Sequence, residues 1–357
     1  MMKNLRKINL SISCFLLLTT YSISQNEIDP DNTLEEKTHF TILEKEGKTQ
    51  YFGQVYKNKR KGIGTEFLNN GQTQTGYFEN DQFLGEYIVS PPWHMVDIDY
   101  NFTNDVEFEK ISVDVNIKNK ISKDEFLYIS PLCSEINGIQ FYAGIQTQCG
   151  GYQNSLHNEE KSEYYEIGKA LIFSRWETRD IKGFQKAPNG VCESSGYEGD
   201  FISVRNSFEW DTGTYTLSLI NTHETIQLNG ELHTFVELQA YDHQNQKTVK
   251  CGKLAFPGER LVLDKRNFMF VELYSELTKI SDTPKGTVSM GNFNYQAPGK
   301  GASSRVLIEE AFALYNKNKP QWARVSLENQ LFKFQFGRPY ARRYHLEYEN
   351  LYVETLK

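Results

Sequence analysis

The chain has 357 residues with 46 acidic and 39 basic side chains, so its formal net charge is −7 at neutral pH. Proteins that bind nucleic acid neutralise phosphates with clustered Lys and Arg, and this balance therefore disfavours a nucleic-acid partner. The 23 Phe and 21 Tyr favour packed sheets, and the length exceeds the size at which one core usually stops growing. We expect a mostly β protein made of a small module and a larger domain.

The first 24 residues have the features of a secretory signal peptide. A basic start precedes an apolar run over 8–20, and small residues follow it that suit cleavage before Gln25. The run is shorter than the roughly 20 residues that span a bilayer, and Cys14 lacks the surroundings of a lipoprotein cysteine. We therefore expect an exported protein, periplasmic or extracellular, that does not span a membrane and whose residues 25–38 form a flexible lead.

A segment that follows the lead occurs twice. Residues 51–64 and 75–87 each contain two glycines nine positions apart, with an Asn between them near the tip. This spacing is typical of a short β-hairpin unit, and it resembles a MORN repeat. The resemblance implies a module over 39–90 that builds a surface for protein or lipid contact. The residues expected to determine its fold are Tyr51, Gly53, Gly62, Gly76, Phe78 and Gly85.

The repeat module is expected to be too small to stand alone. Two copies are fewer than the roughly three that usually make a repeat array stable, so the module should lean on the larger domain through residues 88–100. The prolines at 91 and 92 cannot donate to a strand ladder, and they mark the boundary. The basic run over 57–61 is expected at a hairpin tip as a solvated turn, with contact to a membrane surface as the alternative.

Apolar and polar residues alternate with period two through most of the remaining chain, which predicts half-buried strands. The segment 303–315 fits a helix or a strand, and we favour the strand. Strands of this kind with regular turns and no intervening helices predict a β-sandwich or jelly roll over residues 95–357. The alternating runs are 106–117, 141–146, 170–176, 201–204, 214–220, 234–241, 248–256, 268–274, 322–327 and 332–336.

Four cysteines follow the signal peptide, namely Cys133, Cys149, Cys192 and Cys251. An even number in an exported protein predicts up to two disulfides, with three connectivities open. No pair has the close spacing of a zinc site, so metal ligation is the minor interpretation. Cys133 and Cys149 are the expected pair because a short loop would join them.

Residues 139–215 hold the strongest local pattern of the larger domain. Four motifs follow one another there: Gly-Ile-Gln at 144–146, Ile-Phe-Ser-Arg-Trp at 172–176, a Gly/Glu-rich loop at 192–200, and Trp-Asp-Thr-Gly-Thr-Tyr at 210–215. Their order resembles the secreted family called domain of unknown function 3472, over residues 95–340. The resemblance implies an all-β extracytoplasmic domain whose activity is not established. Glu177 stands where that family usually has Asp, and the loop carries Cys192.

Two tryptophans in these motifs suggest a sugar-binding surface. A Trp on a strand beside Arg or Gln can form a flat platform on which the C–H face of a sugar ring stacks. The ligand-binding residues would then be Gln146, Arg175, Trp176 and Trp210. The alternative is that both tryptophans lie in the core between two sheets, since Trp is usually largely buried.

Carboxylates near the same motifs could form the acid and base of a glycoside hydrolase. The candidates are Glu177 with Asp180, Glu193 with Glu198, and Glu209. Loop carboxylates of this kind would also suit a structural calcium ion, or they are solvated surface. Because acidic residues are abundant in the chain, we assign no catalytic residue and name Glu177 and Glu209 only as weak candidates.

The sequence therefore predicts an exported, non-enzymatic β protein that binds a carbohydrate or another cell-envelope component. It contains no Gly-x-Ser-x-Gly and no His-Glu-x-x-His motif that would indicate a known nucleophile or metallopeptidase site. One alternative is a carbohydrate-active hydrolase or lyase. The other is an interaction scaffold that contacts a protein partner through the repeat module.

Overall fold

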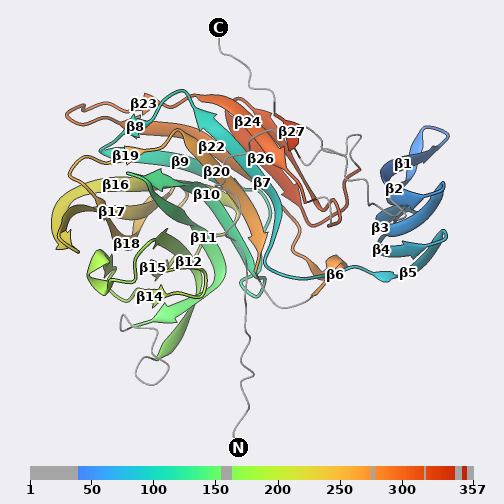
Figure 1. Cartoon of the computed structure of the whole chain (residues 1–357), viewed down its shortest axis with the longest axis horizontal. Helices are drawn as coiled ribbons and strands as arrows, with labels where there is room; N and C mark the ends of the chain where they lie inside the picture. Colours follow the sequence, from blue (N-terminus) through green and yellow to red (C-terminus); the bar gives the residue numbers. More distant parts are fainter. Residues whose placement is uncertain (1–38, 154–162, 275–277, 317–318, 342–347, 352–357) are drawn as a thin grey trace, which may run out of the picture.

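The computed structural model describes residues 39–153, 163–274, 278–316, 319–341 and 348–351 (Figure 1). The predicted signal peptide and flexible lead lie outside this part of the chain. The regular structure of the described residues is 27 strands and two short 3-10 turns, η1 (Ile181–Gly183) and η2 (Ile280–Asp282). The expectation of a mostly β protein is thus confirmed. No helix among the described residues is long and apolar enough to cross a bilayer.

The first five strands form an antiparallel meander that is separate from the larger sheets (Figure 1). Both hairpin tips are two-residue turns, Lys57-Asn58 and Asn80-Asp81, in which every residue has a φ between 49° and 69°. Such turns match the right-handed twist of the flanking strands, which explains the repeated spacing. The strands are β1 (His39–Lys45), β2 (Lys48–Tyr56), β3 (Lys59–Phe67), β4 (Thr73–Glu79) and β5 (Gln82–Glu86).

The interior of this module is one small cluster of Tyr51, Val55 and Phe78. The rings of Tyr51 and Phe78 meet edge to face with centroids 5.2 Å apart, and the Tyr51 hydroxyl donates to the carbonyl of Gln54 at 2.9 Å. Gly64 lies against this ring, and a Cβ there would come within 2.2 Å of the Tyr51 Oη. The glycine therefore makes room for the tyrosine that fills the module.

The module contacts the larger domain through a short ladder. β6 (Ile88–Val89) pairs with β21 (Thr278–Lys279), and the module's own sheet does not extend either large sheet. The Ile280 N–H donates to the carbonyl of Tyr87 at 3.0 Å. Tyr87 and Val89 are both buried in the main core. The segment that leaves the module is therefore fixed by the core of its neighbour.

The larger domain consists of two antiparallel sheets packed face to face. The first, the eleven-strand sheet, has the order β12-β15-β14-β11-β10-β20-β7-β24-β27, with β19 and β8 at one side. Its strands are β7 (Trp93–Phe102), β8 (Val106–Glu107), β10 (Leu127–Ile136), β11 (Ile139–Tyr152), β12 (Tyr164–Trp176), β14 (Val191–Ser195), β15 (Phe201–Ser207), β19 (Val262–Leu263), β20 (Arg266–Leu273), β24 (Ile308–Leu314) and β27 (Tyr348–Asn350).

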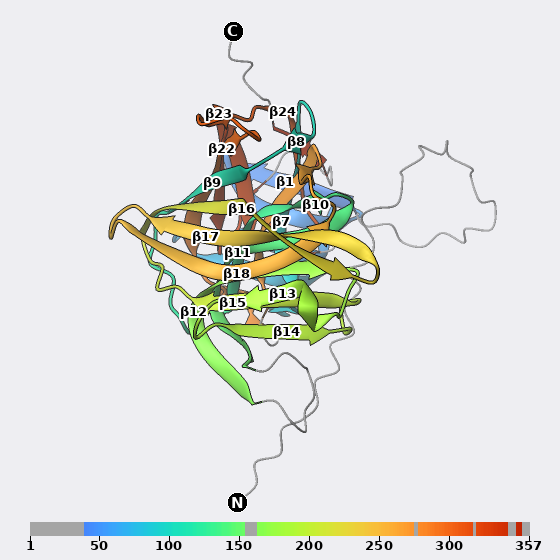
Figure 2. The same ribbon diagram turned by 90° about the vertical axis from the view of Figure 1, so that its left-hand side faces the viewer.

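The second, the nine-strand sheet, has the order β13-β18-β17-β16-β9-β22-β26-β25, with β23 paired to β22. Figure 2 shows β16, β17 and β18 as long neighbouring strands of this sheet. The segment 303–315 contains β23 and the whole of β24, so the strand structure favoured there is confirmed. The strands are β9 (Lys110–Ile117), β13 (Phe184–Lys186), β16 (Gly213–Leu228), β17 (Glu231–Asp242), β18 (Lys247–Pro257), β22 (Gly286–Gln296), β23 (Ser304–Arg305), β25 (Ala323–Glu328) and β26 (Leu331–Phe336).

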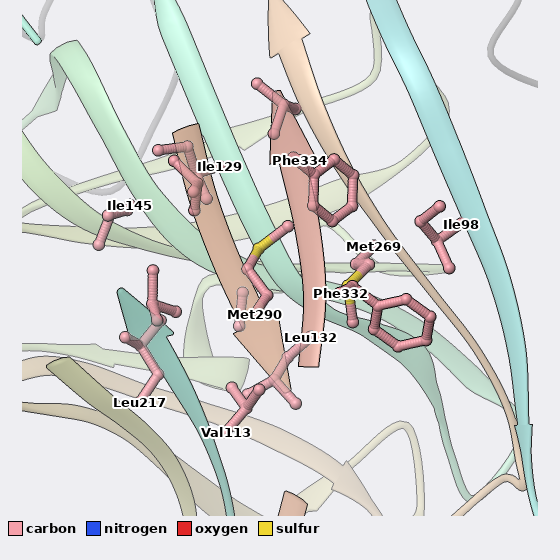
Figure 3. Packing of buried hydrophobic residues seen from close by; sticks show 14 of the residues in the cluster. Ile98, Val113, Ile129, Leu132, Ile145, Leu217, Met269, Met290, Phe332 and Phe334 are labelled. Carbon is pink, nitrogen blue, oxygen red and sulfur yellow. The ribbon is translucent and has the colours of Figure 1, made fainter. Parts of the chain in front are cut away.

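The core lies between the two sheets, where alternate residues of each strand point inward. Figure 3 shows aliphatic side chains of the eleven-strand sheet meeting Leu217, Met290 and the two phenylalanines of β26 from the nine-strand sheet. Burying one such side chain contributes about 1.5–3 kcal/mol, so the many pairs of this layer dominate the stability of the domain.

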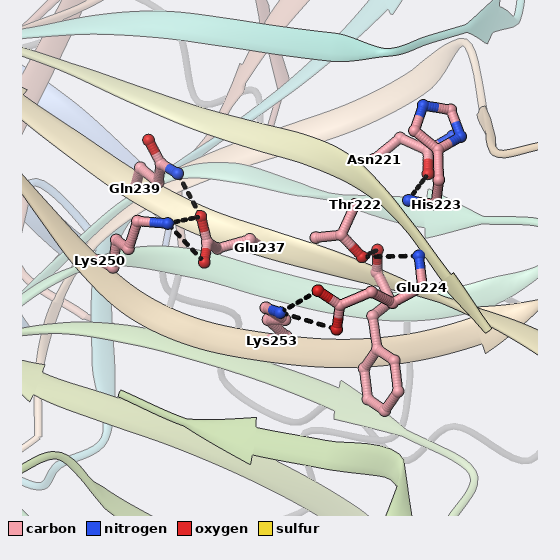
Figure 4. Close-up of polar contacts among 9 residues, drawn as sticks. Asn221, Thr222, His223, Glu224, Glu237, Gln239, Lys250 and Lys253 are labelled. Atoms are coloured by element: carbon pink, nitrogen blue, oxygen red, sulfur yellow. Dashed lines mark hydrogen bonds and ion pairs between the residues drawn. The ribbon is translucent and has the colours of Figure 1, made fainter. Parts of the chain in front are cut away.

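The outer face of the nine-strand sheet carries ion pairs beside a small apolar cluster of Leu228, Phe235 and Ala255. On β16, β17 and β18, Lys250 pairs with Glu237 at 3.0 Å and Lys253 pairs with Glu224 at 2.6 Å (Figure 4). The Lys250 side chain is 60% exposed. Ion pairs with an exposed partner contribute about 0–1 kcal/mol, so these two pairs are ordinary surface contacts.

The four cysteines of the described chain are unpaired, and the expectation of a disulfide is wrong. Cys133 lies opposite Tyr142 on β11, whereas Cys149 lies seven positions further along that strand. That separation is about 20 Å, and a disulfide needs Cα atoms within about 7 Å. All four thiols are buried, and burial raises the pKa of the Cys149 thiol to about 11. The cysteines therefore behave as small apolar residues of the strands.

We predict that Gly64→Ala destabilises the repeat module by about 1–3 kcal/mol, because its methyl group would displace the buried Tyr51 ring. Hydrogen exchange of β2 and β3 should accelerate, while exchange in the nine-strand sheet stays unchanged. The matched control is Gly301→Ala, where a Cβ would meet nothing within 4 Å. Equal exchange in both variants would contradict this account of the module's interior.

We also predict that all four thiols react with iodoacetamide after unfolding without reductant. Mass spectrometry should then show four alkylated positions, at Cys133, Cys149, Cys192 and Cys251. The folded protein should react far more slowly, because the thiols are buried. A mass that is lower by two hydrogens, with two unreactive cysteines, would restore the disulfide.

Candidate functional site

Trp210 and Arg175, two of the four residues of the expected sugar-binding surface, are buried. The expectation that the four residues form one surface is therefore wrong. Trp210 is 1% exposed, and its indole N–H donates to the backbone carbonyl of Gln146 at 3.3 Å. The Lys169 ammonium lies 4.5 Å from the centre of its ring and donates to its carbonyl at 2.8 Å. Trp210 is thus a residue of the inter-sheet core, as the alternative interpretation held.

Arg175 lies on the opposite side of its strand from Trp176, because neighbouring strand residues face opposite ways. Its guanidinium lies 5.3 Å from the centre of the Phe256 ring and donates to the carbonyl of Ala255, so it points toward the nine-strand sheet. Burial lowers the pKa of Arg175 to about 10. It is 3% exposed and therefore not available to a ligand.

Gln146 and Trp176 are both half-buried, but they are far apart on the sheet. Gln146 pairs with Ala170, and Trp176 lies six positions further along β12. At about 3.3 Å per residue, the separation is about 20 Å. Only Trp176 remains a candidate at its end of the sheet.

The carboxylates singled out from the sequence lie in different places. Glu177 is exposed in the turn after β12, with a φ of 67°, and Glu209 is exposed between β15 and β16. Asp180 caps η1 by accepting from the Lys182 N–H at 2.9 Å. Glu177 and Glu209 are therefore surface residues and poor candidates for acid or base.

Aromatic rings cross the outer face of the eleven-strand sheet, the face turned away from the core. Trp176 lies 6.0 Å from Phe201 and 4.6 Å from Tyr142 between ring centres. Tyr142 lies 5.6 Å from Phe270, whose ring stacks on the His94 imidazole at 4.1 Å. We call these five rings, from β15, β12, β11, β20 and β7, the aromatic row. Trp176, Tyr142 and His94 are half-buried, so part of each ring reaches the surface.

A second apolar cluster, separate from the main core, underlies the row and shares Phe270 with it. Its other buried members are Tyr128, Cys133 and Ile172. A bulge in β10 at residues 130–132 contains Pro131, which is tolerated there because a bulge leaves one N–H outside the ladder. Ser174 donates to the Ser203 hydroxyl at 2.9 Å within this layer. The inner side of the aromatic row therefore packs against buried apolar side chains.

His94 and two carboxylates form the polar end of the row. The His94 Nδ1 lies 2.6 Å from Asp97 Oδ1, and its Nε2 lies 3.9 Å from Glu272 Oε1. Burial alone would lower the pKa of His94, but the charge of Asp97 and its hydrogen bond raise that pKa to about 9. Burial raises the pKa of Glu272 to about 7, against the opposing effect of His94. A bulge between Val271 and Glu272 sets this cross-strand pair in register.

Charged groups of β14, β15 and the loop between them flank the other side of the row. Arg205 pairs with Glu193 at 2.5 Å, and both side chains are largely buried. Trp176 donates its indole N–H to the carbonyl of Glu198 at 3.1 Å. Burial, and then the charge of Glu193, raise the pKa of Glu198. The charge of Glu198 also acts to raise the pKa of Glu272, so the two carboxyl groups are electrostatically coupled.

The described residues contain no group of three or more His, Cys, Asp or Glu side chains arranged to hold a metal ion. The structural calcium suggested by the sequence stays a prediction without a described site. What the outer face offers instead is aromatic surface bounded by ionisable groups. Such a face can stack on a ligand ring and exchange hydrogen bonds or protons with it.

Sequence reasoning missed His94, Asp97, Tyr142, Phe270 and Glu272. Tyr142 and Phe270 stood within predicted strands, but nothing marked them as outward-facing. His94 and Glu272 are separated by 178 positions and meet only because β7 pairs with β20. An unexplained His and Asp three positions apart in a strand was the one local signal.

Comparisons with known proteins give no family. No family model matches the sequence, and no curated protein matches it. Among solved structures, scytalido-glutamic peptidase with a transition state analog inhibitor is 8% identical, with a TM-score of 0.34 over 69% of this chain and 98% of that chain. SCP-B, a member of the Eqolisin family of peptidases in a complex with a tripeptide, is 9% identical with a TM-score of 0.29 over the same shares.

We predict that the His94–Asp97 contact makes stability depend on pH. Because the folded pKa of His94 is raised from 6.5 to about 9, its contribution is complete below pH 6.5 and is lost as pH rises through about 9. The difference in free energy of unfolding between wild type and His94→Gln should therefore shrink by about 3 kcal/mol from pH 6 to pH 10. Denaturant titrations at both pH values measure it. In an Asp97→Asn background the shrinkage should largely disappear; a difference that does not change with pH would contradict the assignment.

Proposed function

We propose that the outer face of the eleven-strand sheet binds a carbohydrate chain, and that the aromatic row is its platform. The observation that supports this proposal is the continuous series of ring contacts from Phe201 to His94 across five strands. A ligand could contact the half-buried Trp176, Tyr142 and His94, whereas Phe201 and Phe270 are buried and support them. Sugar rings stack on aromatic faces through their C–H groups, and successive rings that reach the surface suit an extended chain better than a single residue.

Rigidity supports the same proposal. Trp176 is held by its hydrogen bond to the Glu198 carbonyl, and Tyr142 is wedged between Trp176 and Phe270. The apolar cluster beneath the row is buried, so the rings lose little conformational freedom when a ligand arrives. A surface that is ordered before binding has less entropy to lose.

Polar groups along the row could fix the orientation of the chain. The Asp97 and Glu272 carboxyl groups lie at one end, and Glu198 lies beside Trp176 at the other. Sugar hydroxyls donate to carboxylates, and such contacts give specificity to an otherwise apolar platform. With the export predicted from the first 24 residues, a glycan of the cell envelope or the surroundings is the ligand class.

We predict that Trp176→Ala and Tyr142→Ala each weaken glycan binding at least tenfold, which corresponds to about 1.4 kcal/mol. The full chain is screened first on a glycan array, and Kd is then measured by calorimetry for the glycans that bind. Far-ultraviolet circular dichroism checks that each variant is folded.

The matched control is Tyr241→Ala. Tyr241 is 37% exposed on β17 of the nine-strand sheet, so its loss removes an exposed aromatic ring elsewhere. Its Kd should equal that of the wild type. Binding that survives both row variants, or that is lost in Tyr241→Ala, would refute the proposed location.

A further inference from the structure

Tyr197 is an exposed aromatic residue next to the aromatic row. It lies in the loop between β14 and β15 and is 50% exposed. Its ring meets the Phe201 ring edge to face, with the ring centres 5.3 Å apart. Phe201 is the last ring of the row on this side, so Tyr197 continues the series of ring contacts beyond β15.

The backbone of this loop is fixed to the row. The Trp176 indole N–H donates to the carbonyl of Glu198, the residue that follows Tyr197, at 3.1 Å. Gly199 has a φ of 87°, a conformation that glycine adopts without strain, and the chain turns there directly after the accepting carbonyl. The hydrogen bond therefore holds the Tyr197 loop in place relative to Trp176.

The hydroxyl end of Tyr197 is anchored to a buried ion pair. Burial raises the pKa of Tyr197, and the charge of Glu193 and a hydrogen bond to that residue raise it further, so the hydroxyl donates to the Glu193 carboxylate. Glu193 pairs with Arg205, whose guanidinium also donates to the carbonyl of Gly150 on β11. A half-exposed ring that is anchored at its polar end has little freedom left to lose when a ligand binds.

An exposed tyrosine by itself needs no functional explanation, because single apolar side chains are common on protein surfaces. Tyr197 differs in two respects. Its ring continues a series of ring contacts, and its loop is hydrogen-bonded to Trp176, the tryptophan of that series. Both observations place Tyr197 on the same platform as the row.

We propose that Tyr197 is a further ligand-binding residue of this face, and that the platform it completes selects a long linear glycan chain over short oligosaccharides; this inference rests on the proposed function. From β15 to β7 the row crosses five strand pairings, which at 4.7–4.9 Å each gives about 24 Å. A single sugar ring covers one aromatic side chain. Only a chain that runs across the strands can contact all the rings that reach the surface.

The test is a length series, with Kd measured by calorimetry on the full chain. The probes are linear cello-, xylo-, manno- and chito-oligosaccharides of two, four and six residues. In any series that binds, the affinity of the wild type should rise at least tenfold from two residues to six. This measurement needs no variant, so the proposal stays testable if a substitution at Tyr197 prevents folding.

Tyr197→Ala should weaken binding of the six-residue chain about fivefold, the loss expected for one stacked ring. The two-residue chain should lose less than twofold, because it is expected on Trp176 and Tyr142, whose ring centres are 4.6 Å apart. Trp176→Ala should weaken binding at every length. Tyr197→Phe keeps the ring and removes only its anchor, so it should bind the six-residue chain more tightly than Tyr197→Ala does.

The matched control is Tyr164→Ala. Tyr164 is 53% exposed on the same sheet but lies twelve positions before Trp176 on β12, away from the row. Its Kd should equal that of the wild type at every length, and far-ultraviolet circular dichroism checks that each variant is folded.

The outcomes separate the two proposals. A wild type that binds two-residue and six-residue chains equally, or a Tyr197→Ala variant with wild-type Kd for the six-residue chain, would overturn this inference and leave glycan binding by the row intact. A protein that binds no probe of any length would count against the proposed function itself and against this inference with it.

Discussion

The burial of β10 on both of its faces is the constraint on which the larger domain depends. Every residue of this strand except Glu135 is buried. One face enters the main core through Leu127, Ile129, Leu132 and Ile136, while the other carries Tyr128 and Cys133 into the second cluster. β10 pairs with β11 on one edge and with β20 on the other, so its burial fixes both neighbours in place. The aromatic row follows from this, because its rings cover the second cluster.

The same burial accounts for the unusual electrostatics of the outer face. Desolvation disfavours isolated charges and strengthens attraction between charges that remain paired. Glu272 therefore tends to keep its proton, and His94 keeps its charge only because Asp97 contacts it. The pairs on β17 and β18 have one well-exposed partner, such as Lys250, and they are ordinary surface contacts. Charged residues of the same type therefore behave differently on the two sheets. Glu272, on the outer face of the eleven-strand sheet, is largely desolvated, whereas Lys250, on the nine-strand sheet, is well exposed.

The repeat module is a small sheet with few buried side chains of its own. Its interior is a single cluster around Tyr51 and Phe78, and its exit segment is buried against the larger domain through Tyr87 and Val89. Large apolar side chains nevertheless remain exposed on β4, β5 and β6, among them Tyr77, Leu84 and Ile88. The end of the module is fixed to the larger domain by the pairing of β6 with β21.

The amino-acid sequence by itself determined the class of structure and its local turns, because period-two alternation and positive-φ turn residues act within a few residues of chain. It marked Trp176 and Trp210 equally, and only tertiary packing decided that the first reaches the surface and the second lies in the core. Alternation states which residues share a side of a strand but not which side meets the other sheet. The contact of His94 with Glu272, and the separation of Cys133 from Cys149, depend on strand pairing and register. Those are set by burial over the whole domain, and no local pattern encodes them.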